Sequence, residues 1–466
     1  MKEIGKLKTK CSAEIEKSIV SIGFECLDRD LFTPEKSYDL LAQSGVKYAR
    51  VQTGWAKTEK QKGIYDFVWL DSIVDNLKSR GITPWFNVGY GNPVYMDDVP
   101  PTNPTGVGFV PLLYGDEVME AWLNFVKATV EHFSDRVTEY EIWNEPDCDE
   151  FWHPGEPNAS QYAEFVKKTS DAIKSVFPKA ETGACIAKEH GSFLVEFFAT
   201  LPKNTIDFFN YHGYEMAFET NKETELSILF KILKKYGHEN VRIGDGECGH
   251  ASFYPENHGS HPDKQSNEDN QAIWLLRRYI TEASLGVKRI SFFQAVDLGE
   301  KSYVTVKKCQ KVIAKHGLMT CFDYRPKRSH QAMSHISVLL SGDIKAQKLD
   351  FFGKTYGEHR KESKLRYCTF IKNGEPMYCY YHAEFIQDTR NIPLSGKQFS
   401  AHIYTIDDNF GLPENPIVID MFSGKIIEIN ENDIKRYFGR VIIDNLPIAD
   451  YPMVICSKNA VEIDFD

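Results

Sequence analysis

The segment Glu139-Tyr140-Glu141-Ile142-Trp143-Asn144-Glu145-Pro146 joins a short strand-like run to a polar end. Aromatic and β-branched residues favour a strand over 139–143. Proline has no N–H to give to a strand ladder, so Pro146 ends that strand. The segment therefore predicts a strand whose carboxyl end delivers the Asn144 and Glu145 side chains.

Similar apolar runs occur on both sides of this one along the chain. They lie at 19–24, 47–51, 83–88, 181–184, 207–210, 241–245 and 290–295. Segments of helical periodicity separate them at about 34–44, 69–80, 116–133, 159–177, 192–200, 222–236 and 268–285, and a last one lies near 329–340. Eight strand–helix pairs predict a closed (β/α)₈ TIM barrel, because a doubly wound sheet usually stops at five or six strands.

The pattern changes from about Ser341 onward to alternation with a period of two residues. Strand-like runs lie at 366–370, 376–381, 399–406, 416–422, 425–429, 441–443 and 453–456, separated by turn signals such as Asn373-Gly374. This pattern predicts a small C-terminal antiparallel β-sandwich. We therefore expect an α/β fold with a catalytic barrel over 1–340 and a β-sandwich domain over 341–466.

The composition excludes several classes of function. The 466 residues carry 55 basic and 66 acidic side chains, a net charge of −11, which disfavours nucleic acid or an anionic membrane as a partner. No run of 18 uncharged apolar residues and no secretory signal is visible, and the ten cysteines form no CxxC pair. We expect a soluble, cytoplasmic protein; the sequence does not predict its oligomeric state.

Two glutamates follow strands that face each other across the predicted barrel. Glu145 follows the fourth strand, and Glu247 follows the seventh, Val241 to Asp245. Taken singly, Glu145 also fits an exposed turn, and Glu247 also fits an ion pair with Arg50 or Arg242. As a pair about 5 to 5.5 Å apart, they fit the acid/base and the nucleophile of a retaining glycosidase.

These motifs resemble the clan A glycoside hydrolases. The resemblance rests on Trp143-Asn144-Glu145-Pro146, Glu247, Arg50 and His212-Gly213-Tyr214, and it implies a retaining mechanism. It also implies that Asn144 contacts the substrate 2-hydroxyl, that Tyr214 hydrogen-bonds the nucleophile, and that Arg50 lies near it. Within the clan, the length, the Gly63-to-Asp71 region and the sandwich are most similar to family 39, which includes β-xylosidases.

Further substrate contacts are expected on the loops that follow the barrel strands. We predict this role for Trp55, Asn87, Tyr90, Trp152, His153, His212, His250, Phe293 and Gln294. Phe293 and Gln294 stand where clan members commonly carry a tryptophan at the end of strand eight. Packing inside the barrel is the alternative interpretation for the aromatic residues.

No metal or other cofactor is expected. A His-x-His on strand one, an HExxH motif and an aspartate-rich loop are all missing from the sequence. We therefore expect a retaining β-glycoside hydrolase, similar to β-xylosidases, that acts on an oligosaccharide or glycoside. A transglycosylase using the same glycosyl-enzyme and a non-catalytic carbohydrate-binding barrel remain as alternatives.

Overall fold

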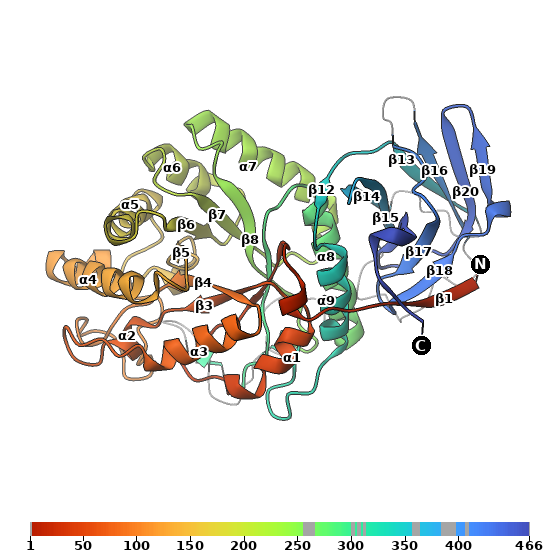
Figure 1. Cartoon of the computed structure of the whole chain (residues 1–466). Coiled ribbons are helices and arrows are strands. Elements are labelled where there is room, and N and C mark those ends of the chain that lie inside the picture. The colour runs from red at the N-terminus through yellow and green to blue at the C-terminus, as the bar shows by residue number, and fades with distance from the viewer. Residues whose placement is uncertain are drawn as a thin grey trace.

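The computed structural model describes residues 2–254, 266–299, 303–304, 309–310, 314–356, 364–383, 398–405 and 410–465. Two parts are visible in Figure 1, a barrel surrounded by helices and a group of antiparallel sheets beside it. The predicted TIM barrel with a C-terminal β-sandwich is therefore confirmed.

Eight parallel strands close the barrel in chain order. They are β2 (Val20–Gly23), β3 (Tyr48–Gln52), β4 (Thr83–Val88), β5 (Glu139–Ile142), β6 (Glu181–Ile186), β7 (Phe208–Gly213), β8 (Arg242–Cys248) and β9 (Ile290–Phe292). The β2–β9 pairing, with Val20 opposite Ile290, completes the closure. Each strand lies within one of the predicted apolar runs or extends it by a few residues.

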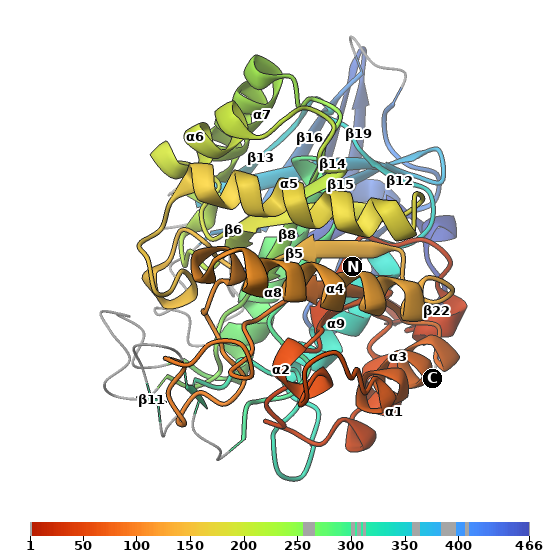
Figure 2. The ribbon, with the colours of Figure 1, turned by 90° about the vertical axis from the view of Figure 1, so that its left-hand side faces the viewer.

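Helices cover the outside of the barrel. They are α1 (Tyr38–Gln43), α2 (Trp55–Thr58), α3 (Val68–Ser79), α4 (Asp116–Phe133), α5 (Ala159–Val176), α6 (Ser192–Thr200), α7 (Lys222–Tyr236), α8 (Glu268–Ser284) and α9 (Arg328–Leu339). Figure 2 shows α4 and α5 side by side across the outer surface, where they contact each other. No helix in the described part of the chain is long and apolar enough to cross a membrane.

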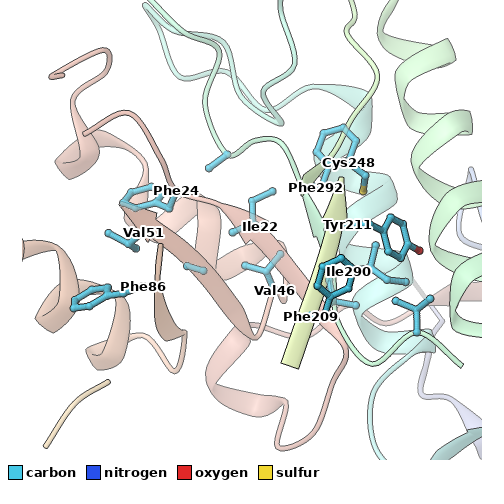
Figure 3. Close-up of a cluster of buried hydrophobic side chains, with 14 of the residues drawn as sticks. Ile22, Phe24, Val46, Val51, Phe86, Phe209, Tyr211, Cys248, Ile290 and Phe292 are labelled. Carbon is cyan, nitrogen blue, oxygen red and sulfur yellow. The ribbon is translucent and has the colours of Figure 1, made fainter. Parts of the chain in front are cut away.

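Apolar side chains from the strands pack into one continuous core with the helices. Figure 3 shows members of this core from several strands, among them Ile22 of β2, Phe86 of β4 and Phe209 of β7. All three are completely buried. This rigid layer fixes where the carboxyl ends of the strands lie, and with them the side chains of the loops that follow.

The C-terminal part consists of two antiparallel sheets. The larger has the order β12-β14-β15-β21-β17-β18-β1-β22 and the smaller β13-β16-β20-β19. Their strands are β1 (Lys2–Leu7), β12 (Ile344–Ala346), β13 (Phe351–Tyr356), β14 (Leu365–Lys372), β15 (Glu375–His382), β16 (Gln398–Tyr404), β17 (Pro416–Asp420), β18 (Lys425–Glu428), β19 (Ile434–Tyr437), β20 (Arg440–Leu446), β21 (Met453–Ser457) and β22 (Ile463–Asp464).

The N-terminal strand belongs to the sandwich, so the predicted start of the barrel domain at residue 1 is wrong. β1 pairs antiparallel with β18, with Lys2 opposite Glu428, and with β22. Figure 1 accordingly shows both chain ends on the sandwich side. The sequence hid this strand because its alternating lysines and glutamate resemble an exposed tail, while its pairing partners lie more than 400 residues away.

The sandwich packs against the barrel through α8 and α9. The Thr281 hydroxyl of α8 lies 2.8 Å from the Tyr381 hydroxyl of β15, and the Lys372 ammonium donates to the Leu339 carbonyl at 2.9 Å. Apolar residues of β14 and β15 belong to the same buried cluster as the barrel core. The sandwich thus covers the side of the barrel formed by these two helices.

Candidate active site

A sharp turn after β5 brings Glu145 to the mouth of the barrel, the opening at the carboxyl ends of the strands. Trp143 and Glu145 both have positive φ, 68° and 42°, in the left-handed region that side chains with a Cβ rarely adopt. The turn directs Trp143 outward, where its ring packs edge-on against Trp122 of α4 and Phe165 of α5. Glu145 is left partly exposed, with 16% of its side chain accessible.

Glu247 is placed by an irregularity near the end of β8. Asp245 pairs with Ile290 of β9, yet Cys248 pairs with Phe292, so the strand bulges between them. Gly244 and Gly246 are needed here, because a Cβ on either would lie 2.3 Å from the Asn210 Oδ1 or 2.8 Å from the Asn210 Cβ. The backbone of β8 therefore closely approaches the side chain of Asn210 at these two glycines.

The structure brings the two glutamates together around His212 of β7. The His212 Nδ1 lies 2.7 Å from the Glu145 Oε1 and 3.9 Å from the Glu247 Oε2. One oxygen of each carboxylate and a ring nitrogen of His212 all lie within 4.8 Å of one another. Two carboxylates thus meet at one point of the mouth, each from a different strand.

Each carboxylate oxygen of Glu247 accepts a hydrogen bond. The Tyr214 hydroxyl donates to Oε1 at 2.5 Å, and the Arg50 Nη1 donates to Oε2 at 2.9 Å. Burial and the neighbouring Glu247 carboxylate raise the pKa of Tyr214 well above its usual range, so Tyr214 remains a donor at any physiological pH. These two contacts fix the orientation of the Glu247 carboxylate, 14% of whose side chain is exposed.

Arg50 of β3 links the buried floor of the site. It is completely buried and donates to Glu25 and Glu247 through Nη1, to Glu141 through Nε and Nη2, and to Asn144 through Nη2. Burial disfavours the guanidinium charge, but the three carboxylates outweigh it and raise the pKa of Arg50 well above its ordinary value. Arg50 is a permanent cation at the centre of this cluster.

The two predicted asparagines occupy different positions. The Asn144 Oδ1 accepts from the Arg50 Nη2 at 2.8 Å, which turns its NH₂ group away from Arg50. Asn87 is completely buried and donates to the Glu141 Oε1 at 3.0 Å and to the Trp143 carbonyl at 2.6 Å. Asn87 therefore supports the turn after β5, whereas Asn144 belongs to the cluster around Arg50.

Burial and the neighbouring carboxylates shift the pKa of His212 in opposite directions. Burial lowers its pKa, while the carboxylates of Glu247 and Glu145 raise it, and the net direction is upward. Its Nε2 is buried and has no hydrogen-bond partner among the described residues. His212 contacts both glutamates through one nitrogen, so its protonation state changes the charge that surrounds the pair.

Three predicted substrate contacts are wrong, because the structure places them in the barrel-helix core. Trp55 is completely buried, stacks on Tyr95 and donates to the Glu59 Oε2 at 2.6 Å. Trp152 is completely buried and packs edge-on against Tyr162 of α5. His250 is completely buried and stacks on Trp274 of α8. Each of them lies on the segment that follows a strand, but that segment turns it back toward the helices instead of the mouth.

The remaining predicted contacts have different surroundings. The Gln52 amide donates to the Tyr90 hydroxyl at 3.4 Å and also to Glu25 in the floor of the site. Phe293 is partly exposed, and its ring lies 5.7 Å from that of His316. Gln294 is buried, and both its amide atoms lack partners among the described residues. His153 is partly exposed beside Phe109.

Several residues of the site escaped the sequence analysis. Glu25 accepts from both Arg50 and Gln52, Asn210 donates to the Glu141 Oε2 at 2.6 Å, and the ring of His316 lies 6.2 Å from that of Tyr214. For Glu141 the alternation of β5 was a usable signal, since every second residue faces the barrel interior. For Glu25 and His316 no motif marked the position.

The chain is similar in sequence to known glycoside hydrolases. Residues 35–241 match the model described as Glycosyl hydrolases family 39. A β-xylosidase from Geobacillus stearothermophilus is 26% identical over 169 residues, which are 33% of this chain and 32% of that protein. The chain thus matches only about a third of the length of this curated relative.

Solved structures extend the likeness over almost the whole chain. A family 39 glycoside hydrolase from the gut symbiont Bacteroides cellulosilyticus WH2 has a TM-score of 0.65 at 17% identity, covering 97% of this chain and 83% of that one. A GH39 β-xylosidase from Caulobacter crescentus has a TM-score of 0.55 at 16% identity and covers 97% of both chains. At these identities the structures show a shared fold. Residues 35–241 are thus similar to family 39 glycoside hydrolases in sequence, and the chain as a whole shares their fold.

Proposed function

We propose that the protein is a retaining β-glycosidase in which Glu145 is the acid/base and Glu247 is the nucleophile. The observation that carries this proposal is the position of the two carboxylates, which have oxygens within 4.8 Å of each other at the barrel mouth. Retaining enzymes hold their carboxyl groups about 5 to 5.5 Å apart, whereas inverting enzymes need about 6.5 to 9.5 Å to admit a water molecule. The spacing supports retention.

The first half of the reaction forms a bond between enzyme and sugar. A carboxylate oxygen of Glu247 attacks the anomeric carbon while the bond from that carbon to the leaving oxygen breaks, and Glu145 gives its proton to that oxygen. Arg50 and Tyr214 keep the Glu247 carboxylate oriented for this attack. The products are the leaving alcohol and a glycosyl ester on Glu247, with Glu145 now ionised.

The second half releases the sugar. Glu145, now a base, takes a proton from water, and the water oxygen bonds to the anomeric carbon as the ester bond to Glu247 breaks. His212, 2.7 Å from the Glu145 Oε1, is placed to respond to this change of charge. The sum is hydrolysis with net retention, because two inversions occur at the same carbon.

The sugar we propose is a β-xyloside or a closely related unit of a glycoside or short oligosaccharide. The support is the partial match to a protein named β-xylosidase and the fold shared with a second one. A panel of nitrophenyl xyloside, glucoside, galactoside, arabinoside and fucoside tests the choice. The highest kcat/KM on the xyloside is expected, and a clear preference for another sugar would overturn this part of the proposal.

The nucleophile assignment is tested with Glu247→Ala on an activated aryl glycoside. Turnover is expected to fall by about 10⁴-fold or more, the scale observed when the group that forms a covalent intermediate is removed. Added azide is expected to restore turnover and to give the glycosyl azide of inverted configuration. Glu131→Ala, on the exposed surface of α4, is the control and keeps full activity. Full activity in Glu247→Ala would refute the assignment.

We also propose a reducing compartment, the cytoplasm, for this protein. The support is that nine of the ten cysteines are shown as free thiols, including Cys368 and Cys379, which lie opposite each other on β14 and β15.

A further inference from the structure

Three carboxylates surround the single guanidinium of Arg50. Glu25 follows β2, Glu141 lies on β5 and Glu247 lies on β8, and all three contact Arg50. Glu25 and Glu247 share the same nitrogen: an Oε2 of each lies 2.9 Å from the Arg50 Nη1. Three negative charges beside one positive charge in a buried site are unfavourable, so the cluster favours binding a proton on one carboxyl group.

The hydrogen-bond donors around the cluster show which group takes that proton. Glu141 accepts from Arg50, Asn87 and Asn210, and these donors occupy both of its oxygens. Glu247 also accepts on both oxygens, from Tyr214 and Arg50. Donors on both oxygens stabilise the ionised form of a carboxyl group. Neither Glu141 nor Glu247 therefore offers a free oxygen for a proton.

Glu25 differs from the other two. Its Oε2 accepts from Arg50 and, at 3.3 Å, from the Gln52 amide, while its Oε1 is buried and has no partner among the described residues. A proton on Oε1 therefore breaks no existing contact. Gln294 lies next to this oxygen, because a Cβ on Gly23 would be 2.8 Å from the Glu25 Oε1 and 3.3 Å from the Gln294 Cβ. Both amide atoms of Gln294 are likewise buried without a partner among the described residues.

The charged groups that face Glu25 come from several strands. Arg50 of β3 and His212 of β7 favour its ionised form, and Glu247 of β8 opposes it; Asp28 and Arg29 form an ion pair on its own loop. Burial is the largest influence, and with Glu247 it raises the pKa of Glu25 from 4.5 to about 8 in spite of Arg50. The electrostatic balance agrees with the count of donors.

We propose that Glu25 is a positioning residue for the nucleophile: it carries a proton near neutral pH, and this leaves the Arg50 guanidinium to hold the Glu247 carboxylate. The proposal rests on the proposed function of Glu247. Loss of the Glu25 proton would place a second anion on the Arg50 Nη1, at most 5.8 Å from the Glu247 Oε2 by the two 2.9 Å contacts. Ionised Glu25 would then compete for Arg50 and repel the nucleophile.

The kinetic test separates Glu25 from Glu145, which also must be protonated for the first step. A dinitrophenyl glycoside needs no protonation of its leaving group, and Glu145→Gln removes the ionisation of Glu145 itself. In this variant we expect kcat/KM for the first step to fall about tenfold per pH unit above about pH 8. In Glu25→Gln/Glu145→Gln, whose amide stays neutral, kcat/KM is expected to remain flat to about pH 10.

Matched variants control for structural damage. Glu25→Gln alone is expected to keep kcat/KM at about pH 6.5 within roughly fivefold of the wild type. The uncharged amide oxygen accepts from the Arg50 Nη1 as the uncharged carboxyl group does. Glu59→Gln replaces another buried glutamate, which accepts from Trp55 and Tyr95 outside this cluster, and it is expected to leave the alkaline fall unchanged. An alkaline fall that persists unchanged after Glu25→Gln, or its absence from Glu145→Gln, would overturn the proposal.

An infrared titration tests the proton without relying on turnover. The difference spectrum between about pH 6 and pH 10 should show loss of a protonated carboxylic-acid band, with a midpoint at about 8, in the wild type and not in Glu25→Gln. Absence of this band from the wild type would overturn the proposal even if the enzyme hydrolyses glycosides. Failure to hydrolyse any aryl glycoside would instead refute the proposed function, and the band would still report on Glu25.

Discussion

Two buried ion clusters lie on opposite faces of the barrel strands. The inner cluster consists of Arg50 with Glu25, Glu141 and Glu247, and the outer cluster consists of Arg278 of α8 with Asp245, Glu282 and Glu215. Both arginines are completely buried. Asp245 and Glu247 are two residues apart on β8, yet they belong to different clusters, since the bulge in this strand lies between them.

The difference lies in what each cluster presents to solvent. The inner cluster ends in Glu247, whose partly exposed carboxylate lies next to the partly exposed Glu145. In the outer cluster Asp245 and Glu282 are completely buried, and only Glu215, with 39% of its side chain exposed, reaches the surface. A buried ion cluster therefore does not by itself mark an active site. The inner cluster is distinguished by two accessible carboxylates that come from different strands and are held at a fixed distance.

The largest difference between the two clusters is expected when the arginine at the centre of each is removed. Arg50→Met leaves the Glu247 and Glu141 carboxylates without their cation, so we expect kcat/KM to fall by about 10³-fold or more, with a stability loss of roughly 3–5 kcal/mol. Arg278→Met should cost a similar amount of stability, but the folded fraction should keep kcat/KM within about tenfold of the wild type. Thermal unfolding and activity per folded molecule, measured side by side, decide whether only the inner cluster serves catalysis.

A smaller change in kcat/KM is expected from substitution of two tyrosines, one on β7 and one on the loop that follows it. Tyr214→Phe removes the hydrogen bond to the Glu247 Oε1, and we expect kcat/KM to fall by roughly 10- to 100-fold, as for a lost bond to a charged group. Tyr211→Phe is the control, because the Tyr211 hydroxyl is buried without a partner among the described residues, and the Lys222 ammonium lies over its ring, 4.9 Å from the centroid. Equal losses in kcat/KM for the two variants would contradict the role of Tyr214.

The proton on Glu25 predicts how stability depends on pH. The pKa of Glu25 is about 8 in the folded protein against 4.5 ordinarily, so between these values the folded state binds one proton more than the unfolded state. Stability therefore falls as pH rises through this range, by up to a few kcal/mol. Glu25→Gln removes this dependence, and its Tm relative to the wild type should rise from about pH 5 to about pH 8. A constant difference in Tm across this range would contradict the prediction.

The smallest effects on activity are expected for the aromatic residues of the helix layer. Trp55→Phe and Trp152→Phe should lower stability by roughly 1–3 kcal/mol, because both side chains fill the core completely. KM for an aryl glycoside should stay within about twofold of the wild type, since neither ring reaches the mouth. A tenfold rise in KM with unchanged Tm would restore them as substrate contacts.

The fold was largely predictable because its signals are local. All eight barrel strands produce short apolar runs, and α6 and α7 begin and end at the predicted residues. Pro146 marked where the chain leaves β5, whereas β8 extends beyond the predicted end at Asp245 to Cys248. Strands such as β13 and β19 were missed, because edge strands of a small sheet carry exposed polar residues and pair with segments far along the chain.

The candidate site was predictable only where a residue lies on a barrel strand or just after its carboxyl end and points inward. Glu145, Glu247, Arg50 and Tyr214 meet as the strand positions indicate. The loop residues were less predictable, since one reversal of a loop turns a side chain from the mouth to the helices. Trp152 is such a case: it packs on Tyr162 although it follows β5 by only ten residues.

By itself the sequence determined the barrel, the sandwich and the identity of the two glutamates, because strand periodicity and strand ends are properties of short segments. Only the tertiary structure decided which residues contact these glutamates. The fold brings the carboxylates of Glu25 and Glu247 to the same nitrogen, the Arg50 Nη1. Asp245, two residues from Glu247, instead pairs with Arg278 of α8. Protonation and ion pairing depend on distances between segments far apart in the chain, and those distances exist only once the barrel has closed.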